Sequence, residues 1–149
     1  MDETESNVSF FRFEDLRIYN KAIDYTTWLY DKLIPFGEEE RLKSFLKQEL
    51  LKSAQNIALN AAEGSSRNKT QFLYYLKMAK SSVRECVVYT ELISRQGLFD
   101  EKQKEYSRNQ LKELTKMIGS LIYSLSRLQN NPGDERKDEQ EETLPDIRY

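Results

Sequence analysis

Apolar residues recur every three or four positions over four stretches of the chain, a spacing that places them on one face of an α-helix. The pattern predicts helices over residues 15–33, 38–64, 68–95 and 100–130. The expected core positions are Tyr19, Ala22, Ile23, Thr26, Leu29, Tyr30 and Leu33 in the first helix, Leu42, Leu46, Leu50, Ser53, Ile57 and Ala61 in the second, Phe72, Leu76, Ala79, Val83, Cys86, Thr90 and Ile93 in the third, and Leu111, Leu114, Ile118, Leu121, Leu125 and Leu128 in the fourth.

Turn and capping residues mark the ends of these helices. The segment 35–37, Pro-Phe-Gly, stops the first helix, and Gly64 is expected to end the second as a left-handed cap. The third and fourth helices begin with the pattern of a capping box, formed by Asn68 with Gln71 and by Asp100 with Gln103. Short turns between long helices make neighbouring helices antiparallel.

The chain is therefore predicted to be all-α, an antiparallel up-down-up-down four-helix bundle. No stretch shows the alternation of a strand. We expect an N-terminal arm over residues 1–12, the bundle over 13–130, and a disordered acidic tail over 131–149, where seven acidic residues stand against three basic ones.

The composition removes most catalytic chemistry. With no histidine and one cysteine, Cys86, the chain lacks the residues of a histidine-based triad or a zinc site, so we expect no enzyme activity, no metal and no cofactor. Chemistry carried by carboxylates alone is the remaining alternative, with Glu49, Glu63 and Glu85 as candidates. They fall on two helices without a residue to complete a site.

The net charge of −2 hides a basic region in the predicted bundle. Residues 41–84 carry nine bases against two acids. Three of these bases, Lys77, Lys80 and Arg84, recur on one face of the third helix and form what we call the basic ridge. With Arg67 and Lys69 near the start of that helix, they are the candidate contacts for nucleic-acid phosphates. The alternative is an ordinary solvated face.

A second apolar stripe runs along the third helix, opposite its core stripe. It contains Tyr74, Met78, Val88, Tyr89 and Leu92, and residues 53–62 of the second helix carry no charge at all. Tyr25 and Trp28 are also placed on the back of the first helix. We therefore predict a homo-oligomer whose interface includes Tyr74, Met78, Tyr89, Leu92 and Trp28. The alternative is that these residues only widen the contacts of a monomeric core.

No window of apolar residues is long enough for a membrane span, and the acidic N-terminus does not resemble a signal peptide. A cytoplasmic protein without a membrane partner is expected.

One family resemblance rests on specific residues. The run 53–67, SAQNIALNAAEGSSR, follows Phe13-Glu14-Asp15-Leu16 and precedes Phe72-Leu73-Tyr74-Tyr75-Leu76. Together they resemble the bacterial four-helix-bundle proteins encoded in intervening sequences of 23S rRNA genes, also called S23 ribosomal proteins. The accessory variability determinant of diversity-generating retroelements is similar to the same family.

The resemblance implies a homopentameric barrel without known catalysis. In the retroelement branch it also implies binding to a reverse transcriptase and its RNA through basic surfaces. The leading hypothesis is thus a bacterial, homo-oligomeric accessory protein that binds RNA or DNA, with a reverse transcriptase as a candidate partner. Its rival is a protein-binding scaffold with no nucleic-acid role.

Overall fold

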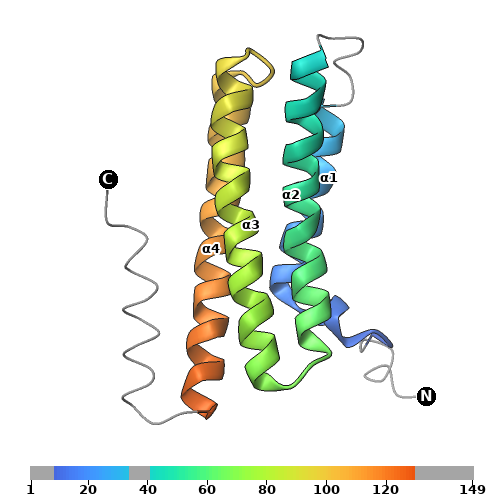
Figure 1. Ribbon diagram of the computed structural model, residues 1–149, viewed down its shortest axis with the longest axis vertical. Coiled ribbons are helices and arrows are strands. Elements are labelled where there is room, and N and C mark those ends of the chain that lie inside the picture. The colour runs from blue at the N-terminus through green and yellow to red at the C-terminus, as the bar shows by residue number, and fades with distance from the viewer. Residues whose placement is uncertain (1–8, 34–40, 130–149) are drawn as a thin grey trace, which may run out of the picture.

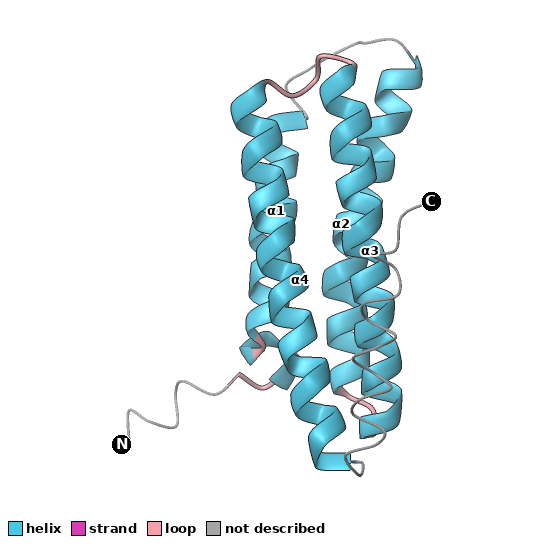
Figure 2. Cartoon of the chain, turned by 90° about the vertical axis from the view of Figure 1, so that its left-hand side faces the viewer, coloured by secondary structure: helices cyan, strands magenta, loops and turns pink. Residues whose placement is uncertain are grey.

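The computed structural model describes residues 9–33 and 41–129, which are almost entirely helical. A short 3-10 helix, η2, spans Arg12–Asp15, and four long helices follow: α1 (Arg17–Leu33), α2 (Arg41–Ser65), α3 (Lys69–Arg95) and α4 (Glu101–Gln129). No strand occurs in these two ranges (Figure 2). The predicted all-α class is confirmed.

The helices pack as an up-down-up-down bundle (Figure 1). Each helix packs against its neighbour in sequence, and α1 closes the ring against α4. The α2–α3 contact is the most extensive and the α1–α4 contact the least. The predicted topology is confirmed, and the pentamer stays a prediction.

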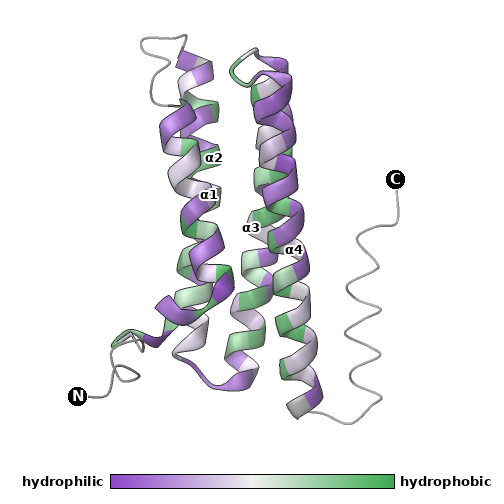
Figure 3. Ribbon diagram, turned by 180° about the vertical axis from the view of Figure 1, so that it is seen from behind, coloured by the Kyte–Doolittle hydropathy of each residue, from purple (hydrophilic) through white to green (hydrophobic). Residues whose placement is uncertain are grey.

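One continuous core runs along the bundle. Leu29, Leu50, Ile57, Leu76 and Ile118 come from all four helices and are completely buried. Hydrophobic and hydrophilic positions alternate around each helix (Figure 3). The predicted stripe of α3 is confirmed, since every member is buried except the partly buried Phe72.

The prediction for α1 is wrong at three positions. Ile23 and Tyr30 are exposed, while Tyr25, placed on the back of the helix, is only 1% exposed. The Tyr25 hydroxyl lies 2.7 Å from Ser107 Oγ, which in turn lies 2.8 Å from Thr90 Oγ1. Burial raises the pKa of Tyr25, so the hydroxyl stays protonated and available for this chain of hydrogen bonds. These bonds satisfy the buried hydroxyl of Tyr25, a residue that periodicity alone assigned to the surface.

Trp28 is also turned toward its own bundle. It is partly buried, and its ring lies 6.2 Å from that of Tyr25, 5.5 Å from Phe99 and 4.7 Å from Tyr106, measured between centroids. This aromatic cluster joins α1 to the start of α4. The place of Trp28 in an oligomer interface stays a prediction.

Both predicted cap residues are confirmed, although at α3 the structure shows only the Asn68 half of the predicted capping box. Asn68 Oδ1 accepts the backbone N–H of Gln71 at 2.9 Å. At α4 the box is reciprocal, because Asp100 Oδ1 accepts from the Gln103 backbone at 2.8 Å and Gln103 Oε1 accepts from the Asp100 backbone at 2.9 Å. The first helix begins two residues later than expected because residues 12–15 form η2.

Gly64 does not end α2 as a left-handed cap, contrary to the prediction. It lies within α2, and Gly97 is the glycine with positive φ in the described part of the chain. A Cβ built on Gly64 would lie 2.6 Å from Tyr75 Cβ and 3.0 Å from Phe72 Cδ1. The glycine therefore permits α2 and α3 to approach closely where they meet, rather than permitting an unusual backbone angle.

Several predictions lie outside the described residues. These concern residues 1–8 of the arm, the stop at 35–37, the start at Glu38 and the tail 131–149, together with the side chains of Leu42 and Leu128. Within the helices that are described, none is both long and apolar enough to cross a membrane.

Candidate nucleic-acid interface

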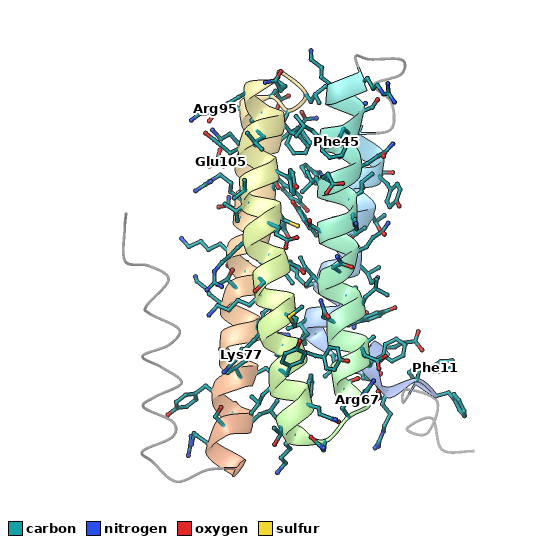
Figure 4. The ribbon with its side chains drawn as sticks, in the orientation of Figure 1. Phe11, Phe45, Arg67, Lys77, Arg95 and Glu105 are labelled. Carbon is teal, nitrogen blue, oxygen red and sulfur yellow. The ribbon has the colours of Figure 1, made fainter. Side chains whose placement is uncertain are left out.

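The basic ridge lies on the side of α3 that faces α4. Lys77 and Arg84 are exposed and Lys80 is partly buried. Glu91 identifies this side, because it lies seven residues after Arg84 on the same face of α3. Its carboxylate forms an ion pair of 2.8 Å with Lys104 of α4. Figure 4 shows Lys77 beside α4 and far from the α2 edge.

The register of α3 against α4 brings a second set of bases to the ridge. At 1.5 Å per residue, Arg84 lies about 10 Å from Glu91 along α3, and Lys112 lies about 12 Å from Lys104 along α4. Because the two helices run antiparallel, Arg84 and Lys112 reach nearly the same level.

Two exposed bases of α4, Arg108 and Lys112, therefore extend the ridge across the seam, whereas Lys116 lines a groove with Asp15 and Arg17. Together with Lys77, Lys80 and Arg84, Arg108 and Lys112 form the surface that we call the basic face. These two α4 bases were not among the predicted contacts. Their spacing of four residues could have indicated a common side of the helix.

A surface groove of ≈ 440 Å³ lies in this seam. Val87, Leu111 and Thr115 line it together with Arg108, Asn109 and Lys112. No acid occurs in α3 from residue 69 to 84. Glu113, the single acid of α4 between residues 106 and 129, lines a different groove with Arg17 and Lys21 of α1. Among the described residues, no carboxylate therefore lines the seam groove itself.

The other end of the same seam has the opposite character. Glu91, Glu101 and Glu105 line a groove of ≈ 470 Å³ there with Lys104 and Arg108. Hydrogen bonds from Lys104 and from Arg95, whose Nε lies 3.1 Å away, lower the pKa of Glu91. Acidic and basic side chains mix at this end, whereas bases, and no acid of the described residues, line the groove toward the middle of the seam.

Arg67 is not part of the basic face. Its guanidinium pairs with Glu63, with Nε at 3.1 Å, and lies 5.6 Å from the centroid of the Tyr75 ring. The Glu63 hydrogen bond raises the pKa of Arg67, whose charge is already compensated. Figure 4 places Arg67 at the foot of α2, away from Lys77. Lys69 is exposed at the first turn of α3. The structure therefore brings together the ridge but not all five predicted contacts.

The bundle as a whole matches a known protein family. The model of the 23S rRNA-intervening sequence protein family matches residues 14–120. The chain belongs to that family. Among solved structures, a protein of unknown function from the S23 ribosomal protein family of Bacteroides thetaiotaomicron VPI-5482 is similar, with a TM-score of 0.62 and 21% identity over 70% of this chain and 97% of that one. At this identity the likeness shows the fold alone. A search of curated proteins gave no match.

The residues that carry the resemblance form a structural corner in this member of the family. Gly64 lets α2 approach Tyr75, Glu63 pairs with Arg67, and the Ser65 and Ser66 hydroxyls donate to the carbonyls of Ala62 and Glu63 at 2.9 and 2.8 Å. Each contact fixes the turn from α2 into α3. The segment that carries the resemblance therefore has a structural role in the α2–α3 corner.

The second apolar stripe of α3 is exposed in the single chain. Tyr74 is 60% exposed, Met78 42% and Leu92 41%, while Tyr89 is partly buried. Leu59 of α2 is 62% exposed in the single chain. We call Tyr74, Met78, Val88 and Leu92 the apolar row.

The candidate carboxylates have structural partners. Glu85 accepts from Ser53 at 2.9 Å, Glu49 accepts from the Tyr89 hydroxyl at 3.5 Å, and Glu63 pairs with Arg67. Burial raises the pKa of the Cys86 thiol, which makes it a poor nucleophile. Among the described residues, no three acids or cysteines converge in a way that could hold a metal ion.

Proposed function

We propose that this family member binds nucleic acid through the basic face of α3 and α4 and performs no catalysis of its own. Its role is then that of an accessory protein, which holds a nucleic acid on which a separate enzyme, such as a reverse transcriptase, acts. The observation that carries the proposal is the convergence of bases from two helices on one seam, with no carboxylate of the described residues lining the groove between them.

The chemistry of the seam suits phosphate. Exposed bases within about one Debye length, ~8 Å in physiological salt, add their fields. Each phosphate that replaces condensed counterions at such bases releases those ions and gains affinity without reading sequence. Arg84 and Arg108 add the planar donor geometry that phosphate oxygens accept.

The proposal also includes self-association through the apolar row. Four apolar side chains on one side of α3 support a second copy as the occupant because the family resemblance implies a closed barrel. Ring closure would repeat the basic face around the assembly and concentrate its field. A protein-binding scaffold remains the rival function, supported by the same apolar row.

The test is the salt dependence of RNA binding by a matched pair of variants. In the double variant Arg84→Gln with Lys112→Gln, we expect weaker binding to unrelated RNA sequences. The slope of log affinity against log salt should become shallower by roughly 0.7 for each single-strand phosphate that the variant no longer neutralises. The control, Arg95→Gln with Lys102→Gln, removes two charges from the other end of α3 and α4 and should leave the slope unchanged.

The outcomes separate the two functions. Equal reductions in affinity in both double variants would show that only net charge matters and would overturn the assignment to the basic face. An absence of binding by the unaltered protein at low salt would overturn the nucleic-acid function and favour the scaffold. Glutamine keeps helix propensity high, so circular dichroism should show equal helix content in all variants.

A further inference from the structure

An exposed tyrosine continues the basic side of α4. Tyr123 is 43% exposed and lies eleven residues, or about three turns, beyond Lys112 on the same side of the helix. The Arg127 guanidinium lies 5.8 Å from the centroid of its ring. An aromatic ring flanked by cations next to a phosphate-binding surface is the combination that proteins use to hold nucleobases by stacking.

Gly119 leaves one flank of this ring open. It lies one helical turn before Tyr123, and a Cβ built on it would meet no atom within 4 Å. Glycine in a helix interior lowers stability relative to alanine, and here neither a close helix approach nor a positive φ requires it. The gap that it leaves faces the seam at the level of Lys77, since residues 77 and 119 occupy matching positions along α3 and α4.

Other exposed tyrosines are engaged within the bundle. The Tyr106 ring packs 4.7 Å from Trp28, Tyr30 accepts a 2.6 Å hydrogen bond from Gln55, and Tyr74 lies edge-on to Tyr75 at 5.5 Å. The contact described for the Tyr123 ring is with a cation that is itself exposed. Of these tyrosines, Tyr123 thus combines exposure, neighbouring charge and an open flank.

We propose that Tyr123 is a stacking platform for a base of a single-stranded nucleic acid whose backbone follows the basic face. This inference rests on the proposed function and narrows its substrate class. Bases in a duplex are paired and stacked on one another, so they are not free to lie on a side chain, whereas a single strand can turn one base onto the ring. Arg127 then covers the other face of the ring or contacts the adjacent phosphate.

The experiment compares Tyr123→Ala and Tyr123→Phe in the full chain. Binding to oligouridine, to oligothymidine and to a mixed-sequence RNA duplex of equal phosphate number is measured by fluorescence anisotropy. Tyr123→Ala should lose about 5- to 150-fold in affinity for both single strands and leave the duplex affinity unchanged. Tyr123→Phe retains an aromatic ring and should bind single strands nearly as the unaltered protein does.

Each other result is decisive. If Tyr123→Ala leaves single-strand affinity unchanged while the unaltered protein binds, the stacking inference fails and the basic face stands. An equal reduction on single strands and duplex also overturns it, because the ring would then act without a free base. Failure of the unaltered protein to bind any of the three probes overturns the proposed function itself. A reduction confined to oligouridine would support stacking with a preference for RNA.

Discussion

At the residue scale, two glycines within helices have opposite surroundings. A Cβ on Gly64 would lie 2.6 Å from Tyr75 Cβ, whereas a Cβ on Gly119 would meet nothing within 4 Å. Backbone strain explains neither residue, because neither has a positive φ. The first glycine is therefore required by packing at the α2–α3 corner, and the second is available for a role at the surface.

These surroundings predict opposite effects of the same substitution. Gly64→Ala should destabilise the protein by about 1–3 kcal/mol, because the two backbones must separate to accommodate the methyl group. Gly119→Ala should stabilise it by about 0.5–1 kcal/mol through the higher helix propensity of alanine. Urea unfolding followed by circular dichroism measures both. A stable Gly64→Ala variant would show that the corner adapts and that the close approach is not required.

The sequence identified the residues of this corner but not the contacts that they make. The run 53–67 indicated the family, yet the close approach of Gly64 to Tyr75 depends on how α3 returns along α2. Similarly, Tyr25 falls outside the first apolar stripe, and its burial depends on Ser107 and Thr90 from two other helices. Periodicity within one helix contains no information about such partners.

At the element scale, helix starts were predictable because their signals are local. The cap of α4 lies within four residues, from Asp100 to Gln103, and both of its hydrogen bonds are present. The extent of the basic face was not predictable in the same way. Lys112 joins Arg84 only through the register between α3 and α4, which a single helix pattern does not specify.

The α4 cap supplies a prediction at this scale. Asp100→Ala should destabilise the protein by about 0.5–2 kcal/mol, because the first backbone N–H groups of α4 lose an acceptor. Asp100→Asn is the matched control, since its side-chain oxygen can still accept from Gln103, and it should retain most of the stability. Thermal unfolding by calorimetry compares the three proteins. Equal destabilisation in the two variants would indicate that charge at the helix start, rather than the cap hydrogen bond, stabilises α4.

At the scale of the whole molecule, α3 separates two surfaces of different character. Its α4 side carries the basic ridge, while the apolar row lies between that ridge and the α2 side. An assembly that buries the apolar row can therefore leave the basic face open. The two proposed activities, self-association and nucleic-acid binding, do not compete for the same side chains.

This separation yields a prediction about oligomeric mass. The unaltered protein should have a native mass about five times the 17.7 kDa of one chain. Met78→Glu with Leu92→Glu should give monomers, because each new carboxylate would have to be desolvated within an apolar interface. Light scattering coupled to size exclusion measures the mass, and circular dichroism shows whether each monomer remains folded.

A control variant replaces two apolar side chains of similar exposure on α1. Ile23 and Tyr30 are 40% and 38% exposed, close to the 42% and 41% of Met78 and Leu92. Ile23→Glu with Tyr30→Glu should keep the native mass if the interface is the apolar row. Dissociation by the α1 variant alone would place the interface on α1 instead. A monomeric mass for the unaltered protein would contradict self-association directly, and the basic face would then have to bind nucleic acid as a single copy.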